Sequence, residues 1–302
     1  MTAIRLQCPR CGCAIEALRC RACRFPLRID HGITRALAPE SVRRLARFMG
    51  DYERIREAEC RGSQDAGFYL GLPYADVTGR HRGQWRMRAR SYDYLVRRLL
   101  PGADAGGRIL DLGAGNGWLS FRLALAGYRP YAVDLLTNER DGLAAARHFR
   151  SRLPRLFPRF QADLGHLPFA DRQFDAAVFN ASFHYAEDGQ ACLREALRCL
   201  RPGGTVVISD TPWYPRAEDG ERMLAERRAS FLREHGTAAD SLASLHYLTD
   251  ARLQAMAQAL SLRWEVHRPW YGLAWAARPV LARLRRAREP SRFRLYVARK
   301  PG

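Results

Sequence analysis

The sequence predicts an α/β fold: one large domain built on a mostly parallel, doubly wound sheet, preceded by a small cysteine-rich module. Three observations support this prediction. An apolar run at 109–112 leads directly into the glycine-rich loop 113–117. Strand-like and helix-like segments then alternate as far as the C-terminus. Two Cys-x-x-Cys pairs stand within the first 23 residues.

The length and composition fit a globular chain. With 302 residues, 47% of them hydrophobic, the chain can build one large core and a small appendage. No apolar run approaches the roughly 20 residues of a membrane span. The opening residues "MTAIRLQCPR" lack the apolar stretch of a signal peptide. We therefore expect no membrane span and a cytoplasmic protein, whose thiols are reduced and free to bind metal.

The charge is strongly positive and unevenly placed. The net charge is +19, and Lys300 is the only lysine among 50 basic residues. Residues 1–100 carry net +10, residues 101–200 carry +1, and residues 201–302 carry +8. Two interpretations stay open: an arginine-rich solvated surface, or attraction for an anionic acceptor such as RNA, a nucleotide or a phosphorylated lipid.

The cysteine pairs have the spacing of a metal site. Cys8 and Cys11 form one pair and Cys20 and Cys23 the other, so that two chain reversals can bring four thiolates together. Four sulfur ligands in a tetrahedron suit Zn²⁺ and leave no open position, which predicts a structural zinc. Cys13 could replace Cys11 as a ligand. A redox pair is disfavoured because no βαβ unit surrounds the motif.

The segment "CRACRFPLRIDHGI" resembles the zinc-binding domain of methyltransferase activator subunits and their stand-alone bacterial relatives. The similarity covers about 35 residues, although His31 separates Asp30 from Gly32 where that family has Asp-Gly-Ile. The resemblance implies an accessory, non-catalytic zinc-binding domain over residues 1–38, fused to its enzyme.

The stretch "RILDLGAGNGWLSFRLALAGYRPYAVDLL" carries most of the functional information. It predicts a buried strand, a tight glycine loop, a helix ending at Gly127, and a second strand that ends near Asp134. Glycines allow the backbone to approach a ligand closely, and an acidic residue after the second strand can accept hydrogen bonds from both ribose hydroxyls. This order predicts a nucleotide-binding, Rossmann-like core.

The motifs "LDLGAGNG", "FQADLGHLPFADRQFDAAVFNASFHY" and "CLRPGGTVVISD" follow one another in an order that resembles the class I S-adenosylmethionine-dependent methyltransferases. The nearest resemblance is to the broad family of quinone-biosynthesis and natural-product methyltransferases. It implies a seven-stranded sheet whose last strand is antiparallel, over residues 101–302, and S-adenosylmethionine as the cofactor.

The resemblance also implies roles for individual residues. The methionine end of the cofactor would meet Asp111, Gly113, Gly115 and Gly117; the ribose and adenine would meet Asp134, Leu135, Asp163 and Leu164. Asn180 would face both the sulfonium and the acceptor. If the acceptor is a hydroxyl it needs a base, and His184 is the best placed, with His246 second. Acidic carbon or nitrogen acceptors need less help.

Segments around the core are expected to cover the site. Residues 39–100 have helical periodicity and would close over the cofactor, with Tyr69, Tyr74 and Arg82 as candidate contacts. Insertions at 211–248 and 271–291 would roof the acceptor, and Thr249 would cap a helix. The insertions and their flanks carry six aromatics expected to form an acceptor pocket: Trp213, Tyr214, Tyr247, Trp270, Tyr271 and Trp275.

The arginine-rich end of the second insertion bears on the choice of acceptor. Residues 278–294 hold seven arginines and one acid, and Val280, Leu281 and Leu284 give this stretch an apolar side that we expect to lie on the lid. The leading hypothesis is methyl transfer to a small molecule, with no obligate protein partner. An rRNA or tRNA base methyltransferase, its zinc domain and basic flanks contacting RNA, is the alternative. A non-catalytic cofactor-binding scaffold is a lesser one.

Overall fold

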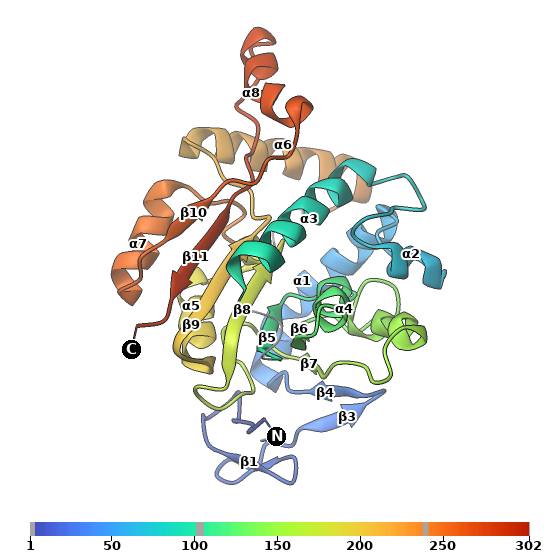
Figure 1. Ribbon diagram of the computed structural model, residues 1–302, viewed down its shortest axis with the longest axis vertical. Coiled ribbons are helices and arrows are strands. Elements are labelled where there is room, and N and C mark those ends of the chain that lie inside the picture. Colours follow the sequence, from blue (N-terminus) through green and yellow to red (C-terminus); the bar gives the residue numbers. More distant parts are fainter. Residues whose placement is uncertain (1–3, 101–105, 238–240, 302) are drawn as a thin grey trace.

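A computed structural model describes residues 4–100, 106–237 and 241–301 of the chain. Its centre is a twisted sheet with helices packed on both faces, and the N-terminal module lies at one end of the molecule (Figure 1). Nine strands form this sheet in the order β10-β11-β9-β8-β5-β6-β7-β4-β3. The carboxyl ends of its parallel strands gather at one edge, where such folds bind ligands.

Seven of the nine strands make up the predicted sheet. They are β5 (Arg108–Leu112), β6 (Arg129–Asp134), β7 (Arg159–Gln161), β8 (Phe174–Asn180), β9 (Leu200–Ser209), β10 (Glu265–His267) and β11 (Leu295–Arg299). The central pairs are parallel, with Asp111 opposite both Ala132 and Val178. Strand β11 runs antiparallel to both of its neighbours. The predicted α/β fold and its antiparallel last strand are confirmed.

The N-terminal module is joined to the sheet more closely than the sequence suggested. Strands β1 (Ile15–Glu16) and β2 (Arg19–Cys20) form a separate hairpin that carries the cysteines. Strands β3 (Arg28–Asp30) and β4 (Ile33–Arg35) instead extend the main sheet, since β4 pairs in parallel with β7. Residues 28–35, assigned from the sequence to a zinc-binding domain over residues 1–38, are thus part of the main sheet; backbone hydrogen bonds to a distant strand carry no local sequence signal.

Helices cover the sheet on both faces. They are α1 (Pro39–Ala58), α2 (Ala66–Gly71), α3 (Arg82–Tyr94, continued by a π-helical turn over Leu95–Leu99), α4 (Trp118–Leu125), α5 (Gly189–Cys199), α6 (Ala217–His235), α7 (Asp250–Leu260) and α8 (Leu273–Leu284), with 3₁₀ segments at Leu143–Ser151 and Phe183–Tyr185. One core lies between the sheet and α5 and α7, and the other between the sheet and α3, α4 and 143–151. Helices α1 and α3 confirm the helical prediction for 39–100.

Alternation along the strands creates these two cores. On β8, Ala176 and Val178 enter one core while Ala177 and Phe179 enter the other. Successive side chains of a strand point to opposite faces, so a strand covered on both sides is apolar throughout. This explains why residues 176–179, "AAVF", are apolar without interruption, and why the next polar residue, Asn180, lies at the carboxyl end of the strand.

The two insertions behave differently. Helix α6 lies across the carboxyl edge of the sheet, and the Thr249 hydroxyl accepts a hydrogen bond from Arg252 N (3.2 Å), which confirms the predicted cap of α7. Helix α8 projects away from the body at the end opposite the N-terminal module (Figure 1). It has no buried residue, so its apolar side does not lie on a lid as expected. Within the described residues, no helix is long and apolar enough to cross a membrane.

Candidate active site

A cavity of about 740 Å³ opens at the carboxyl ends of the parallel strands. Its volume is within the range of small-molecule sites. The ends of β5, β6 and β7 line one half, and the ends of β8 and β9 line the other. The structure brings nearly all the predicted cofactor residues to this cavity: Asp111, Gly113, Gly115, Asp134, Leu135, Asp163, Leu164 and Asn180. Gly117 does not line it.

The glycine loop is fixed by hydrogen bonds to the neighbouring strand. The N–H groups of Gly113 and Ala114 donate to Val133 O over 2.8 and 3.0 Å. Gly113 has a φ of +79°, and a Cβ there would collide with the side chain of Ser182. The nearby Gly117, at +81°, caps the start of α4, and a Cβ there would meet Phe157, so its requirement for glycine has a structural reason.

Two buried carboxylates flank the loop. Asp111 Oδ2 accepts hydrogen bonds from the Ser120 N–H (3.1 Å) and hydroxyl (2.7 Å), whereas its Oδ1 is buried without a partner in the described structure. Asp134 accepts from the N–H groups of Gly115 and Leu136, both at 2.8 Å. Burial raises the pKa of Asp111 to about 7 and that of Asp134 to about 6. A ligand that brings a cation or hydroxyl donors would satisfy both groups.

Asp163 lies two residues beyond β7 and is held from three sides. Its Oδ2 accepts hydrogen bonds from the Ser41 hydroxyl (3.1 Å) and from Arg44 (2.5 Å), both on α1. Its Oδ1 accepts from Gly165 N at 3.0 Å. Arg44 also pairs with Glu187, so one arginine joins the loops after β7 and β8 beneath α1. Asp163 thus fixes the edge of the cavity where an adenine was expected.

The other half of the cavity lies over β8 and β9. Asn180 ends β8, and the Ser182 hydroxyl two residues later donates to Leu112 O at 2.5 Å. Asp210, directly after β9, accepts a hydrogen bond from the Ser91 hydroxyl (2.5 Å), while its Oδ2 is buried without a partner in the described structure. Ala181 and Asp210 both have positive φ, at 54° and 53°. Such strained backbone is frequent at functional sites.

His184 and His246 both line this half of the cavity. Burial lowers the pKa of His184 to about 3, with nearby arginines adding to the effect, and its Nδ1 has no partner among the described residues. Burial likewise lowers the pKa of His246 to about 4, and Arg227 donates to its Nδ1 over 2.9 Å. Both rings are therefore neutral near pH 7. A ring with so low a pKa is a weak base but a good hydrogen-bonding group.

Helices α1 and α3 supply lining residues that the sequence reading missed. Arg56 on α1 and Arg88 on α3 both reach the cavity, and so does Tyr52. Arg88 contacts the Trp85 ring at 4.7 Å, and burial lowers its pKa to about 10. Helical periodicity marked these faces as apolar but gave no sign of which arginine turns inward. The three residues that the sequence suggested as cofactor contacts do not line this cavity. The Tyr69 hydroxyl donates to backbone carbonyls, and the Tyr74 hydroxyl donates to Asp93. Arg82 lies with Tyr74 at a different, smaller pocket.

The predicted aromatic roof is not formed by the residues proposed for it. Of the six, Trp213, Tyr214, Tyr247 and Tyr271 are buried in the protein, Trp275 packs on Phe293, and Trp270 is 64% exposed. The cavity's aromatic lining is instead Phe48, Tyr52, Trp85, Trp118, Tyr185, Phe231 and Phe293. The first insertion does contribute, through Arg227, Phe231 and residues 241–246; residues 238–240 of it lie outside the described part. No residue of 271–291 lines the cavity.

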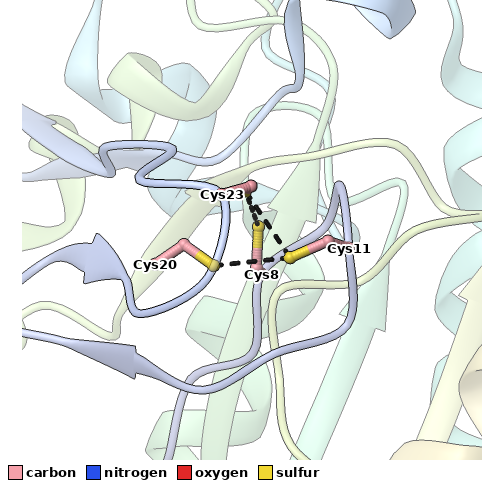
Figure 2. A group of neighbouring side chains, drawn as sticks. All are labelled: Cys8, Cys11, Cys20 and Cys23. Carbon is pink, nitrogen blue, oxygen red and sulfur yellow. Dashed lines mark hydrogen bonds between the residues drawn. The ribbon is translucent and has the colours of Figure 1, made fainter.

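The four paired cysteines converge in the N-terminal module (Figure 2). All four sulfur atoms lie within 4.8 Å of one another. The Cys8–Cys23, Cys11–Cys20 and Cys11–Cys23 separations are 3.6, 3.4 and 3.5 Å. Bonds of about 2.3 Å to a tetrahedral zinc require sulfur separations of roughly 3.8 Å, so the cluster fits this ion. Cys13 is exposed and stands outside the cluster.

Comparison with known proteins shows which family the core of this chain resembles. Residues 110–208 match the methyltransferase domain family. Curated relatives include 27-O-demethylrifamycin SV methyltransferase of Amycolatopsis mediterranei, 29% identical over 55% of this chain and 61% of the relative, and demethylmenaquinone methyltransferase of Beutenbergia cavernae, 38% identical over 38% and 46%. The chain thus spans about half the length of these relatives.

A solved structure has the same fold. It is the complex of the Haloferax volcanii Trm112 methyltransferase activator with a methyltransferase, at a TM-score of 0.50 and 18% identity, covering 78% of this chain and 97% of that one. At this identity the match concerns the fold alone.

Proposed function

We propose that this chain, whose residues 110–208 match the methyltransferase domain family, is a class I S-adenosylmethionine-dependent methyltransferase that transfers a methyl group to a small-molecule acceptor. The observation that carries the proposal is the two-part cavity. Its first half combines the glycine loop with Asp111 and Asp134, and its second half continues within the same cavity over the ends of β8 and β9. A methyltransferase needs two such adjoining spaces, one for the methyl donor and one for the acceptor.

The first half fits S-adenosylmethionine by its donor set. The unpartnered Asp111 Oδ1 would accept from the ammonium group of the methionine end, and Asp134 would accept from the two ribose hydroxyls. Leu135 and Leu164 would pack against the adenine, with Asp163 at its edge. Bound cofactor supplies a methyl group already activated by a sulfonium. The protein therefore has to exclude water and hold the acceptor in line with that group.

The second half supplies positioning groups for the acceptor. Asn180 would lie where the two halves of the cavity meet, and His184, Asp210 and Arg88 line the second half. With a pKa of about 3, neutral His184 would orient an acceptor by a hydrogen bond more readily than it would remove a proton. This favours an acceptor atom that is nucleophilic without a strong base. The two curated relatives carry names that refer to demethylrifamycin and demethylmenaquinone, which supports a small-molecule acceptor.

We further propose that the cysteine cluster holds one structural zinc. Its ligands would be Cys8, Cys11, Cys20 and Cys23, all sulfur, with no position left for catalysis. The module resembles an activator subunit, and here it shares a sheet with the core through β4 and β7. The fused module would therefore replace a separate activator, and we expect no additional protein partner to be needed for activity.

RNA base methylation is the second candidate. What favours it is the basic end of α8, where Arg283, Arg285 and Arg286 have no ion-pair partner in the described part of the chain. Against it, none of these arginines lines the cavity, and α8 projects away from the body of the protein (Figure 1). A non-catalytic scaffold would bind only the cofactor and would not need the second half of the cavity, which disfavours that function.

The deciding experiment is radiolabelled methyl transfer from S-adenosylmethionine to a metabolite extract and, in parallel, to total RNA. We expect label in the small-molecule fraction, lost with Asp134→Ala. Label in RNA alone would show that the acceptor is RNA and not a small molecule. Cofactor binding by calorimetry without label in either fraction would favour the scaffold.

A further inference from the structure

Helix α8 carries its apolar side outward, into solvent. Leu273, Val280 and Leu284 are 80%, 58% and 77% exposed, and at 3.6 residues per turn they fall within roughly 40° of one another around the helix. Leu281, at 45% exposure, extends this surface, and Trp270, 64% exposed, lies three residues before the helix begins. Contiguous exposed apolar side chains of this kind mark interaction surfaces.

The opposite side of α8 is fixed to the protein, so this orientation is built in. Trp275 stacks on Phe293 with ring centroids 5.4 Å apart, and Arg278 lies over the Trp275 ring at 3.9 Å. Arg278 also donates to Ser291 O over 3.3 Å. At the base of the helix, the buried Tyr271 hydroxyl is hydrogen bonded to Ser91 (2.9 Å). The helix is therefore anchored by an aromatic and an arginine, while its leucines face away.

Positive charge borders the exposed apolar surface. Arg283, Arg285 and Arg286 are exposed and have no ion-pair partner among the described residues. No acidic residue occurs between Glu265 and Glu289. Neighbouring arginines differ, since Arg288 pairs with Glu226 and Arg292 with Glu289. The three arginines at the end of α8 are therefore available to bind an anionic partner.

We propose that α8 and Trp270 form a docking surface for an anionic lipid bilayer. A helix with leucine and tryptophan on one side and arginine beside it binds at a membrane interface, with the apolar side chains among the acyl chains and the cations at the phosphates. RNA would match the arginines but leave five large apolar side chains in water. The projection of α8 beyond the body allows it to reach a flat surface without collision (Figure 1). The proposal does not depend on which acceptor is methylated.

The test is flotation of the full-length protein with vesicles of equal phosphatidylglycerol and phosphatidylcholine, compared with phosphatidylcholine alone. We expect binding to the anionic vesicles, at least tenfold weaker to the neutral ones, and a blue shift of tryptophan emission that Trp270→Phe diminishes. Leu273→Ser/Leu284→Ser should reduce binding at least tenfold, and so should Arg285→Glu/Arg286→Glu. The matched control is Leu125→Ser, a 51% exposed leucine on α4, which should bind as the unaltered protein does.

Three outcomes would overturn the proposal. The first is absence of vesicle binding. The second is binding that the leucine variant leaves unchanged, which would mean attraction by charge alone. The third is tight, salt-sensitive RNA binding that only the arginine variant abolishes. Circular dichroism of each variant would show that the fold is retained, as expected for side chains this exposed.

Discussion

Arg56 on α1 and Asp141, in the loop after β6, form a two-pronged ion pair at the wall of the cavity. The Nε–Oδ2 and Nη2–Oδ1 distances are 2.5 and 2.9 Å. Burial by itself would lower the pKa of Arg56, but the charge and hydrogen bonds of Asp141, together with nearby tyrosines, outweigh burial and hold that pKa well above its usual value. The pair therefore fastens the covering helix to the nucleotide-binding core.

Removing one partner should be costly. Because Arg56→Ala leaves the largely buried Asp141 carboxylate uncompensated, we expect it to lower the free energy of unfolding by about 3–5 kcal/mol. Urea denaturation followed by circular dichroism measures this. Glu57→Ala, also on α1, breaks a pair with Arg140 in which both side chains are exposed; it is the control and should change the free energy by less than about 1 kcal/mol. Equal effects of the two variants would contradict the role assigned to Arg56.

The proposed zinc makes a separate prediction. Purified protein should contain one zinc per chain by elemental analysis, and Cys20→Ser should release it. Because structural zinc sites contribute folding energy directly, the module should become protease-sensitive while the core remains folded. Cys13→Ser, outside the cluster, is the matched control and should keep the metal. Metal-free protein with four reduced thiols would refute the assignment.

The cofactor contact of Asp134 can be tested by affinity. Asp134→Ala should weaken S-adenosylmethionine binding by about 1.5–3 kcal/mol, the value of a hydrogen bond to a charged group. Gly115→Val should weaken it further, since Gly115 has a φ of +54° and lies on the cavity wall. Isothermal titration calorimetry gives both values. Gly203→Ala controls for positive φ alone, because Gly203 has a φ of +72° on β9 and does not line the cavity. Unchanged affinity in both site variants would remove these residues from the site.

Cofactor binding should depend on pH through Asp111. Its pKa of about 7 means that the cofactor-free protein is largely protonated there at pH 6, whereas an ammonium ligand requires the carboxylate. Affinity should therefore fall as the pH drops below 7, by up to about tenfold per unit, and level off as the pH approaches 8 and the carboxylate becomes fully ionised. Calorimetry in buffers of different ionisation enthalpy should detect proton release on binding near pH 6.5. Asp111→Asn should abolish this release along with most of the affinity.

The same pKa shift has the opposite consequence for the cofactor-free fold. A carboxyl whose native pKa is raised stabilises the fold below its unfolded pKa of about 4, and this contribution is lost as the pH rises through 7. Asp111 should therefore make the cofactor-free protein less stable at pH 8 than at pH 5, other groups being equal. Comparing the pH profile of the melting temperature with that of Asp111→Asn isolates the effect. If the substitution left the pH profile of the melting temperature unchanged, a group other than Asp111 would be responsible for it.

The sequence determined by itself the features that depend on neighbours in the chain. The run "RILDLGAGNG" specified a buried strand and a loop in which Gly113, Gly115 and Gly117 all have positive φ. The Cys-x-x-Cys spacing indicated that two pairs of thiols could converge, with Cys13 as an alternative to Cys11, and periodicity indicated α1 and α3. Such patterns work because side-chain direction and turn geometry repeat over a few residues.

Only the tertiary structure decided which residues meet across long chain distances. It joined β4 to β7, turned Arg56 and Arg88 into the cavity, and buried Trp213 and Tyr247 away from it. It also left the apolar side of α8 in solvent, although the same pattern normally indicates a face packed on a core. The physical reason is that an amphipathic pattern indicates only which face of a helix is apolar, whereas long-range packing determines which partner covers that face.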